Sequence, residues 1–349
     1  MILNELSVPI VLAPMAGGPS TPELTAAVSA AGGLGLLAAG YLTATDTAAR
    51  LAATRELTTA PFGVNLFTPG PATAPEDFAD YLAELGHTHE LGTPKYDTDD
   101  WDAKLELLVK APVPVVTFTF GCPSAAEVAR LHEVGSEVWV TVTSAAEGRI
   151  AVAAGADVLI AQGAEAGGHR ATFIDRVDDD ATDPLTVLAL LQILRATVDR
   201  PIVATGGITT GAGIAAALAA GATAAQLGTV FLRSPEAGTN PVHRAALHHA
   251  DTPTMLTRAF TGRRARGLRN RFMDEHSATA PVAYPEIHYA TAPLRAAART
   301  AGNPANVNMW AGQTYPLAPE LPAGELVRTL AADAKTALTT ALSGRIQSC

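Results

Sequence analysis

Short apolar runs alternate with alanine-rich stretches of helical length along most of the chain. Polar or glycine residues bound the apolar runs, which is typical of buried strands. Because strands that alternate with helices form parallel sheets, the pattern predicts an α/β fold. Eight strands are expected, at residues 8–15, 34–39, 62–67, 113–120, 137–143, 157–160, 201–205 and 224–229.

The intervening helices have start and stop signals in the sequence. Thr21 and Pro22 open a helix near residues 21–31, and Ser124 and Ser144 are each followed three residues later by a glutamate, as in a capping box. Two more helices are predicted near 184–197 and 211–220. Glycines stand where helix C-caps are expected, at Gly32, Gly135, Gly155 and Gly221.

Eight such repeats predict a (β/α)8 barrel, the TIM barrel, over residues 1–232. No G-x-G-x-x-G fingerprint follows the first strand, which argues against an open dinucleotide-binding sheet. Residues 68–105, rich in Pro, Thr, Asp and His, are expected to form a lid-like insertion. Residues 233–322 are predicted to be a small helical subdomain over the barrel mouth, and 323–349 a C-terminal helix that packs on the barrel.

Composition narrows the class of protein. Hydrophobic residues make up 48% of the 349, enough for a large core, and the formal net charge of −10 argues against nucleic acid and anionic membrane surfaces as partners. No apolar run is long enough to span a membrane, and the N-terminus lacks signal-peptide features. Cys122 and Cys349 make neither a disulfide framework nor a zinc site. A cytoplasmic protein without a metal is expected, as a monomer or a homodimer.

Polar and glycine residues gather at the predicted strand ends, where barrels of this type hold their active sites. Glycines end the seventh and eighth strands, each before a helix, which predicts a phosphate site made from backbone N–H groups. The alternative is that these glycines only make tight turns. The polar and glycine residues at the strand ends are Asn65, Gln162, His169, Gly206, Gly207, Gln226, Gly228 and Thr229.

His169 lies in the glycine-rich stretch 161–170, directly after a predicted buried strand. Glycines allow the backbone to approach a ligand closely, and a histidine exchanges protons readily near neutral pH. A lone histidine is more often structural than catalytic, but a glycine-flanked position at a barrel mouth favours catalysis.

Other candidate residues are weaker. His87 and His89 have no Cys or carboxylate at metal-ligand spacing, and Cys122 has no basic partner nearby. The basic run 263–271 fits an anion site and an ion-paired surface equally well. Trp310 is expected either at the substrate pocket or in the subdomain core.

A set of short stretches, in one order over most of the chain, resembles the flavin-dependent nitronate monooxygenases, formerly called 2-nitropropane dioxygenases. The resemblance implies a TIM barrel that holds FMN non-covalently and oxidises alkyl nitronates with dioxygen to a carbonyl compound and nitrite. The stretches are Ala13-Pro14-Met15-Ala16-Gly17-Gly18, 63–65, 142–144, 162–169, 206–208, 226–229, 258–263 and 310–313.

The resemblance also implies roles at matching positions. His169 would be the catalytic residue, either as the base that removes a proton beside the nitro group or, when protonated, as the anchor of the nitro oxygens. The implied FMN contacts are Ala13, Met15, Asn65, Gln162, Gly167, Gly206, Gly207, Gln226, Leu227, Gly228 and Thr229.

Three other functions remain open at this point. An FMN-dependent NAD(P)H reductase acting on enoyl thioesters or quinones resembles the same barrel, although no NAD(P)H-binding surface is evident. A cofactor-free lyase or isomerase for sugar phosphates is disfavoured because no strand has an obvious Schiff-base lysine. A non-catalytic binding protein is disfavoured because the polar groups converge on one mouth.

Overall fold

The computed structural model describes residues 1–177 and 184–343, so Cys349 and the end of the predicted C-terminal segment lie outside the described residues. Eight parallel strands follow the order β1-β9-β8-β6-β5-β4-β3-β2, and a parallel bridge between Val11 and Leu34 closes the sheet. This is the predicted (β/α)8 barrel. Its strands are β1 (Ile10–Leu12), β2 (Gly35–Ala38), β3 (Phe62–Phe67), β4 (Val115–Thr119), β5 (Glu137–Val142), β6 (Val158–Gln162), β8 (Ile202–Thr205) and β9 (Ala224–Leu227).

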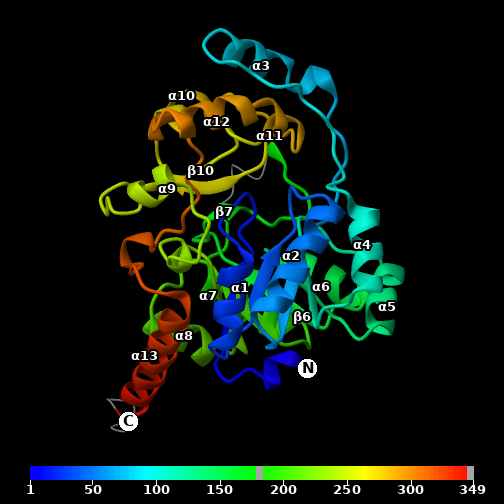
Figure 1. Ribbon diagram of the computed structural model, residues 1–349, viewed down its shortest axis with the longest axis vertical. Coiled ribbons are helices and arrows are strands. Elements are labelled where there is room, and N and C mark those ends of the chain that lie inside the picture. Colours follow the sequence, from blue (N-terminus) through cyan, green and yellow to red (C-terminus); the bar gives the residue numbers. More distant parts are fainter. Residues whose placement is uncertain (178–183, 344–349) are drawn as a thin grey trace.

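Helices surround the barrel (Figure 1). The predicted caps form at Thr21, which accepts a hydrogen bond from Leu24 N (3.0 Å), and at Ser124, which makes a full capping box with Glu127. All four glycines predicted at helix ends adopt positive φ, which favours glycine there. The helices are α1 (Pro22–Ala30), α2 (Ala44–Leu57), α4 (Trp101–Lys110), α5 (Ala125–Glu133), α6 (Ala145–Ala154), α7 (Val187–Thr197), α8 (Gly211–Ala219) and α13 (Ala323–Ser343).

Side-chain alternation along the strands makes two apolar layers. In β6, Val158 and Ile160 belong to a cluster inside the barrel, whereas Leu159 belongs to the cluster between the sheet and the helices. The inner cluster includes Trp139, which is fully buried, and Ile2 from the N-terminal segment. The N-terminal end of the barrel is therefore filled, and the carboxyl ends of the strands are left for a site.

The segment 233–322 lies above these carboxyl ends (Figure 1). Besides the expected helices, it contains two strands that the sequence analysis did not anticipate, β10 (Thr254–Thr257) and β11 (Ala265–Leu268). They form an antiparallel sheet with β7 (Gly168–His169), which belongs to the glycine-histidine loop of the barrel. The helices of this segment are α9 (Pro241–Ala246), α10 (Arg271–His276), α11 (Glu286–Ala290) and α12 (Ala292–Thr300).

The insertion after β3 carries α3 (Ala79–Gly86), and its predicted range overlaps α4, which begins at Trp101. Tyr81 and Leu85 of α3 pack with Phe272 and Ile287 in one apolar cluster. The Tyr81 hydroxyl also donates to the carbonyl oxygen of Ala259 (2.7 Å). The insertion thus packs into the core of the segment 233–322, the upper lobe.

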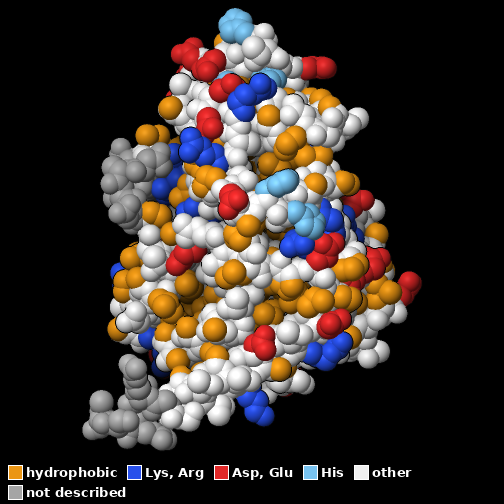
Figure 2. Space-filling view, turned by 90° about the vertical axis from the view of Figure 1, so that its left-hand side faces the viewer, with side chains coloured by type: hydrophobic (Ala, Val, Ile, Leu, Met, Phe, Trp, Pro, Cys, Tyr) orange, Lys and Arg blue, Asp and Glu red, His pale blue; other side chains and the backbone are white. Residues whose placement is uncertain are grey.

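The C-terminal helix α13 lies along α8 and α1 (Figure 1). A Cβ at Gly211 would come within 2.3 Å of Asp333 Cβ, so only glycine allows this close approach. No helix among the described residues is both long and apolar enough to cross a membrane. On the face in Figure 2, acidic and basic side chains lie interspersed.

Candidate active site

A cavity of about 830 Å³ opens at the carboxyl ends of the barrel strands, between the barrel and the upper lobe. Its volume lies in the range of small-molecule and cofactor sites, about 300–1,000 Å³. All the site residues predicted from the sequence line it, with the exception of Leu227. Because side chains alternate along β9, Gln226 faces the cavity, whereas Leu227 is buried in the core and its carbonyl oxygen accepts a hydrogen bond from Ala13 N (2.8 Å).

The ends of β8 and β9 form one side of the cavity. Gly206 and Gly207 have φ values of 118° and 66°, a conformation that other residues rarely adopt. The backbone N–H groups of Gly206, Gly207 and Gly228 have no hydrogen-bond acceptor among the described residues. Unpaired N–H groups at adjacent strand ends are the arrangement that binds a phosphate.

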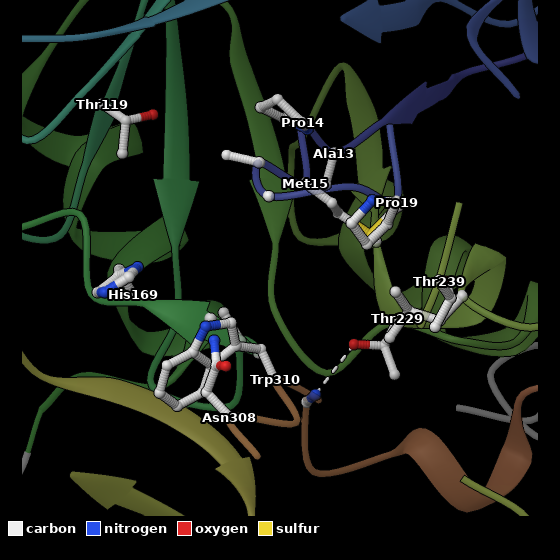
Figure 3. Close-up of a pocket in the computed structure, with 18 of the residues that line it drawn as sticks. Ala13, Pro14, Met15, Pro19, Thr119, His169, Thr229, Thr239, Asn308 and Trp310 are labelled. Carbon is white, nitrogen blue, oxygen red and sulfur yellow. Dashed lines mark hydrogen bonds between the residues drawn. The ribbon is translucent and has the colours of Figure 1, made fainter. Parts of the chain in front are cut away.

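Thr229 occupies the same side, where its hydroxyl accepts a hydrogen bond from Gly312 N at 2.9 Å (Figure 3). In the same view His169 and Trp310 lie to the left of Thr229, and Ala13 and Met15 lie above them. The sequence analysis predicted Trp310 either at the substrate pocket or in the subdomain core. In the structure Trp310 does both, because it lines the cavity and packs beside Phe260.

Gln226 and Asn65 are polar side chains of the cavity floor with different partners. The amide of Asn65 donates to the hydroxyls of Thr117 (2.9 Å) and Thr119 (3.0 Å). The Oε1 atom of Gln226 is buried and has no hydrogen-bond partner among the described residues. Since buried polar atoms are normally paired, the lone oxygen of Gln226 indicates a position where a ligand donates a hydrogen bond.

Gln162 uses its amide within the protein. Its Nε2 donates to the carbonyl oxygen of His169 (3.0 Å), and its Oε1 accepts from Arg170 Nη1 (3.1 Å) and Ala171 N (2.9 Å). The sequence analysis did not anticipate these contacts. They tie the end of β6 to the loop that presents the histidine.

His169 faces the cavity from β7, enclosed by the rings of Phe120, Tyr284 and Trp310, each with its centroid 5.6 Å from the imidazole. Burial, and after it the nearby positive charges of Arg263 and Arg295, lower the pKa of His169 to about 3. The imidazole is therefore neutral at neutral pH.

The hydrogen bonds of Thr261 define which imidazole nitrogen is protonated. The single hydroxyl proton of Thr261 is donated to the carbonyl oxygen of Arg263 (3.1 Å), and its oxygen lies 2.9 Å from His169 Nε2. In the tautomer that this pairing favours, the oxygen accepts from Nε2–H. Nδ1 is then unprotonated and has no hydrogen-bond partner among the described residues, and His169 lines the cavity.

A cluster that the sequence analysis missed completes the wall around the histidine. Tyr41 stacks on His288 with ring centroids 4.1 Å apart, and the Tyr284 hydroxyl donates to the Tyr41 hydroxyl (3.1 Å). The Arg263 guanidinium lies 4.2 Å from the centroid of the Phe120 ring. These residues come from distant parts of the chain, so no local pattern points to them.

The basic run 263–271 divides into two parts. Arg263 and Arg266 are buried and donate to backbone carbonyl oxygens of the glycine-histidine loop and its neighbours, including Arg170 O (3.3 Å) and Ala164 O (2.9 Å). Arg269 and Arg271 are exposed and pair with acidic residues of α10. The first part thus holds the loop, and the second is the ion-paired surface that the sequence analysis also considered.

The remaining candidates lie outside the cavity lining. Burial raises the pKa of the Cys122 thiol to about 11, so a thiolate is disfavoured. His87 is exposed, and His89 contacts the rings of Phe272 and His276. Within residues 1–177 and 184–343 no cluster of three or more His, Cys, Asp or Glu side chains could hold a metal ion.

Comparison with known proteins agrees with the family resemblance that the sequence motifs indicated. The family model described as nitronate monooxygenase matches residues 2–333. The chain belongs to the nitronate monooxygenase family. A nitronate monooxygenase of Pseudomonas aeruginosa is 42% identical over 92% of this chain and 95% of its own length. Members of this family are oxidoreductases, and flavin is their usual cofactor.

Solved structures of related proteins have the same fold. A nitroalkane oxidase from Streptomyces ansochromogenes superposes with a TM-score of 0.94 at 49% identity, covering 98% of this chain and 99% of that one. FabK from Thermotoga maritima superposes with a TM-score of 0.72 at 28% identity, covering 98% and 97% of the two chains.

Proposed function

We propose that the protein oxidises alkyl nitronates with dioxygen to a carbonyl compound and nitrite, with FMN as its cofactor. The observation that carries the proposal is the neutral His169, which lines a cavity with unpaired phosphate-type donors at its other side. The family and the relatives named above support the same reaction.

The residues of the cavity fit FMN. The unpaired N–H groups of Gly206, Gly207 and Gly228 suit its phosphate, with the buried and unpaired hydroxyl of Thr314 beside them. The Oε1 of Gln226 suits a donor on the ring system. A Cβ at Gly168 would meet no atom within 4 Å, so glycine there leaves room in the cavity. Bound FMN would accept electrons from the substrate and pass them to dioxygen.

His169 has two possible substrates to act on. With a neutral nitroalkane, the free Nδ1 takes the proton from the carbon next to the nitro group. With a preformed nitronate no proton has to be removed, and a neutral imidazole adds no positive charge. The expected role of a protonated His169 as an anchor is therefore disfavoured by the low pKa.

The enclosure of the histidine serves the same reaction. The rings of Phe120, Tyr284 and Trp310 surround the imidazole, and Gln162 fixes the backbone of His169. A fixed base in a dry site transfers a proton without reorganisation of solvent.

Two measurements test the proposal. The first is an absorbance spectrum of the purified protein, and the second is the change in that spectrum when ethyl nitronate or, separately, NADH is added without air. Reduction of bound FMN by ethyl nitronate alone, with nitrite formed once air is admitted, is the expected result. Rapid reduction of the bound FMN by NADH alone would indicate an NAD(P)H reductase instead. A colourless protein that takes up no FMN would overturn the cofactor assignment.

A further inference from the structure

The cavity has an unbalanced positive charge. Its lining contains no aspartate, glutamate or lysine among the described residues, but it contains two arginines, Arg295 and Arg299. Both belong to α12, one helical turn apart, so their side chains lie on the same face. In a protein whose net charge is −10, such a wall is a specific feature of this cavity.

Arg295 is only 5% exposed, and the partners of its guanidinium are all neutral. Its Nε donates to the Thr291 hydroxyl (3.1 Å), and its Nη2 donates to the carbonyl oxygen of His288 (2.6 Å). The ion pairs of the described residues include neither Arg295 nor Arg299. A buried cation without a counter-ion is costly, so this wall favours an anionic ligand.

Arg295 lies across the barrel mouth from the predicted phosphate site. Arg295 binds His288, which stacks on Tyr41, and Tyr41 in turn contacts Phe67 at the end of β3. In the closed sheet β3 stands opposite β8, whose end carries the glycines Gly206 and Gly207. The phosphate of a cofactor bound there is therefore not the counter-ion of Arg295.

The arginines lie instead on the side of the catalytic histidine. Tyr284 links the two, since its ring centroid is 5.6 Å from that of His169 and its hydroxyl bonds to Tyr41. The charge of Arg295 lowers the pKa of His169, whereas the charge of Arg299 lowers the pKa of His288. Arg263 acts more strongly on the pKa of His169 but does not line the cavity, so Arg295 is the cavity-lining cation whose charge reaches the histidine.

We propose that Arg295, assisted by Arg299, binds the negatively charged nitro group of the nitronate and selects the anion over the neutral nitroalkane. The inference rests on the proposed function. Nε and Nη2 of Arg295 are bound to Thr291 and His288, whereas Nη1 has no hydrogen-bond partner among the described residues, so its N–H groups remain for the oxygens of a nitronate. Arg295 thereby supplies the positive charge that the neutral His169 lacks.

The test compares Arg295→Gln and Arg295→Lys with the parent enzyme in its FMN-bound form. We expect Arg295→Gln to lower kcat/KM for ethyl nitronate at least tenfold and to raise the Kd for nitrite, an anion of similar shape, at least tenfold, because the variant loses a charge-assisted hydrogen bond to the anion. For neutral nitroethane, kcat/KM should change less than threefold. If nitroethane is not turned over, its inhibition constant against ethyl nitronate should change less than threefold. Arg295→Lys should recover part of the loss.

Arg271→Gln is the matched control, because Arg271 lies in the same segment with 61% of its side chain exposed and pairs with Glu275. It should leave both constants unchanged. If Arg295→Gln does not fold, Arg299→Gln carries the test, with a severalfold loss expected for ethyl nitronate and nitrite only.

Unchanged nitronate kinetics and nitrite binding in Arg295→Gln would overturn the inference, as would an equal loss for the anion and the neutral nitroalkane in the variant that folds. Failure of the proposed function looks different. In that case the parent enzyme itself oxidises no nitronate, and the nitrite titration still reports whether Arg295 binds an anion.

Discussion

The side-chain amide of Gln162 donates a hydrogen bond of 3.0 Å to the backbone carbonyl oxygen of His169. One residue ends a barrel strand and the other belongs to a two-residue strand of a different sheet. The position of the histidine over the barrel is therefore set partly by a side chain that performs no chemistry itself.

Replacing Gln162 with methionine tests this relationship. The substitution keeps the length of the side chain but removes the bonds to His169, Arg170 and Ala171, each worth about 1 kcal/mol or more. We expect kcat for ethyl nitronate to fall about tenfold while the fold persists, as measured by steady-state kinetics and circular dichroism. Gln192→Met on the exposed face of α7 is the control, and equal kcat values for the two variants would contradict the prediction.

His169→Asn should keep the flavin and lose most turnover of neutral nitroethane, because asparagine cannot accept the proton. Turnover of preformed ethyl nitronate should fall less, since that substrate needs no base. The measurement is kcat/KM with each substrate, together with the flavin-to-protein ratio. Equal losses with both substrates would remove His169 from the role of base.

The pH dependence follows from the lowered pKa of His169. With a folded-state pKa of about 3, below the usual 6.5, the imidazole stays unprotonated as the pH falls through 6 and 5. The rate with freshly dissolved neutral nitroethane should therefore stay level from pH 7 to about 5 and decline only toward pH 3. A decline centred near pH 6.5, absent in His169→Asn, would show that the histidine is not desolvated as the structure indicates.

Gly207→Ala should weaken flavin retention. The backbone has positive φ there, and the new Cβ would lie 2.7 Å from Glu165 Cβ, so the predicted phosphate loop must move. Gly135→Ala introduces similar backbone strain in a place where a Cβ meets nothing within 4 Å, remote from the cavity lining. Flavin content after dialysis should fall in the first variant only; full occupancy in Gly207→Ala would argue against a phosphate at this loop.

Leu85→Ala should destabilise the protein by about 2–5 kcal/mol in urea unfolding, because Leu85 is fully buried in the cluster that joins α3 to the upper lobe. Leu57→Ala, at a side chain that is 53% exposed, should change stability by less than about 0.5 kcal/mol. A change that small in Leu85→Ala would mean that α3 contributes little to the core of the upper lobe.

The sequence predicts the elements whose signal is local. The barrel strands are periodic apolar runs, and the glycines at helix ends need positive φ in any context, so both could be recognised without knowing the fold. Their common place at the predicted strand ends then grouped His169 with the other polar and glycine residues, and the resemblance to known enzymes added Ala13, Met15 and Gly167. Only Leu227 does not line the cavity, because alternation along β9 turns it away from Gln226.

The wall opposite the predicted phosphate site could not be predicted in this way. Tyr41, Tyr284 and Arg295 are far apart in sequence and meet only when the upper lobe folds over the barrel. The strands β10 and β11 are short and partly polar, so they lack the apolar pattern that marked the barrel strands. Tertiary contacts, not local preference, decide both features.

The pairing of β7 with β11 also bears on how new substrate ranges can arise. His169 stands opposite Ala265, so the strand that holds the reactive imidazole is braced by the same lobe that supplies Arg295 and Trp310. A chimera with residues 233–322 of a relative would replace the pocket wall and, at the same time, the strand that pairs with the segment carrying His169. When family members recombine in this segment, substrate selectivity and the position of the proton-accepting histidine should therefore change together.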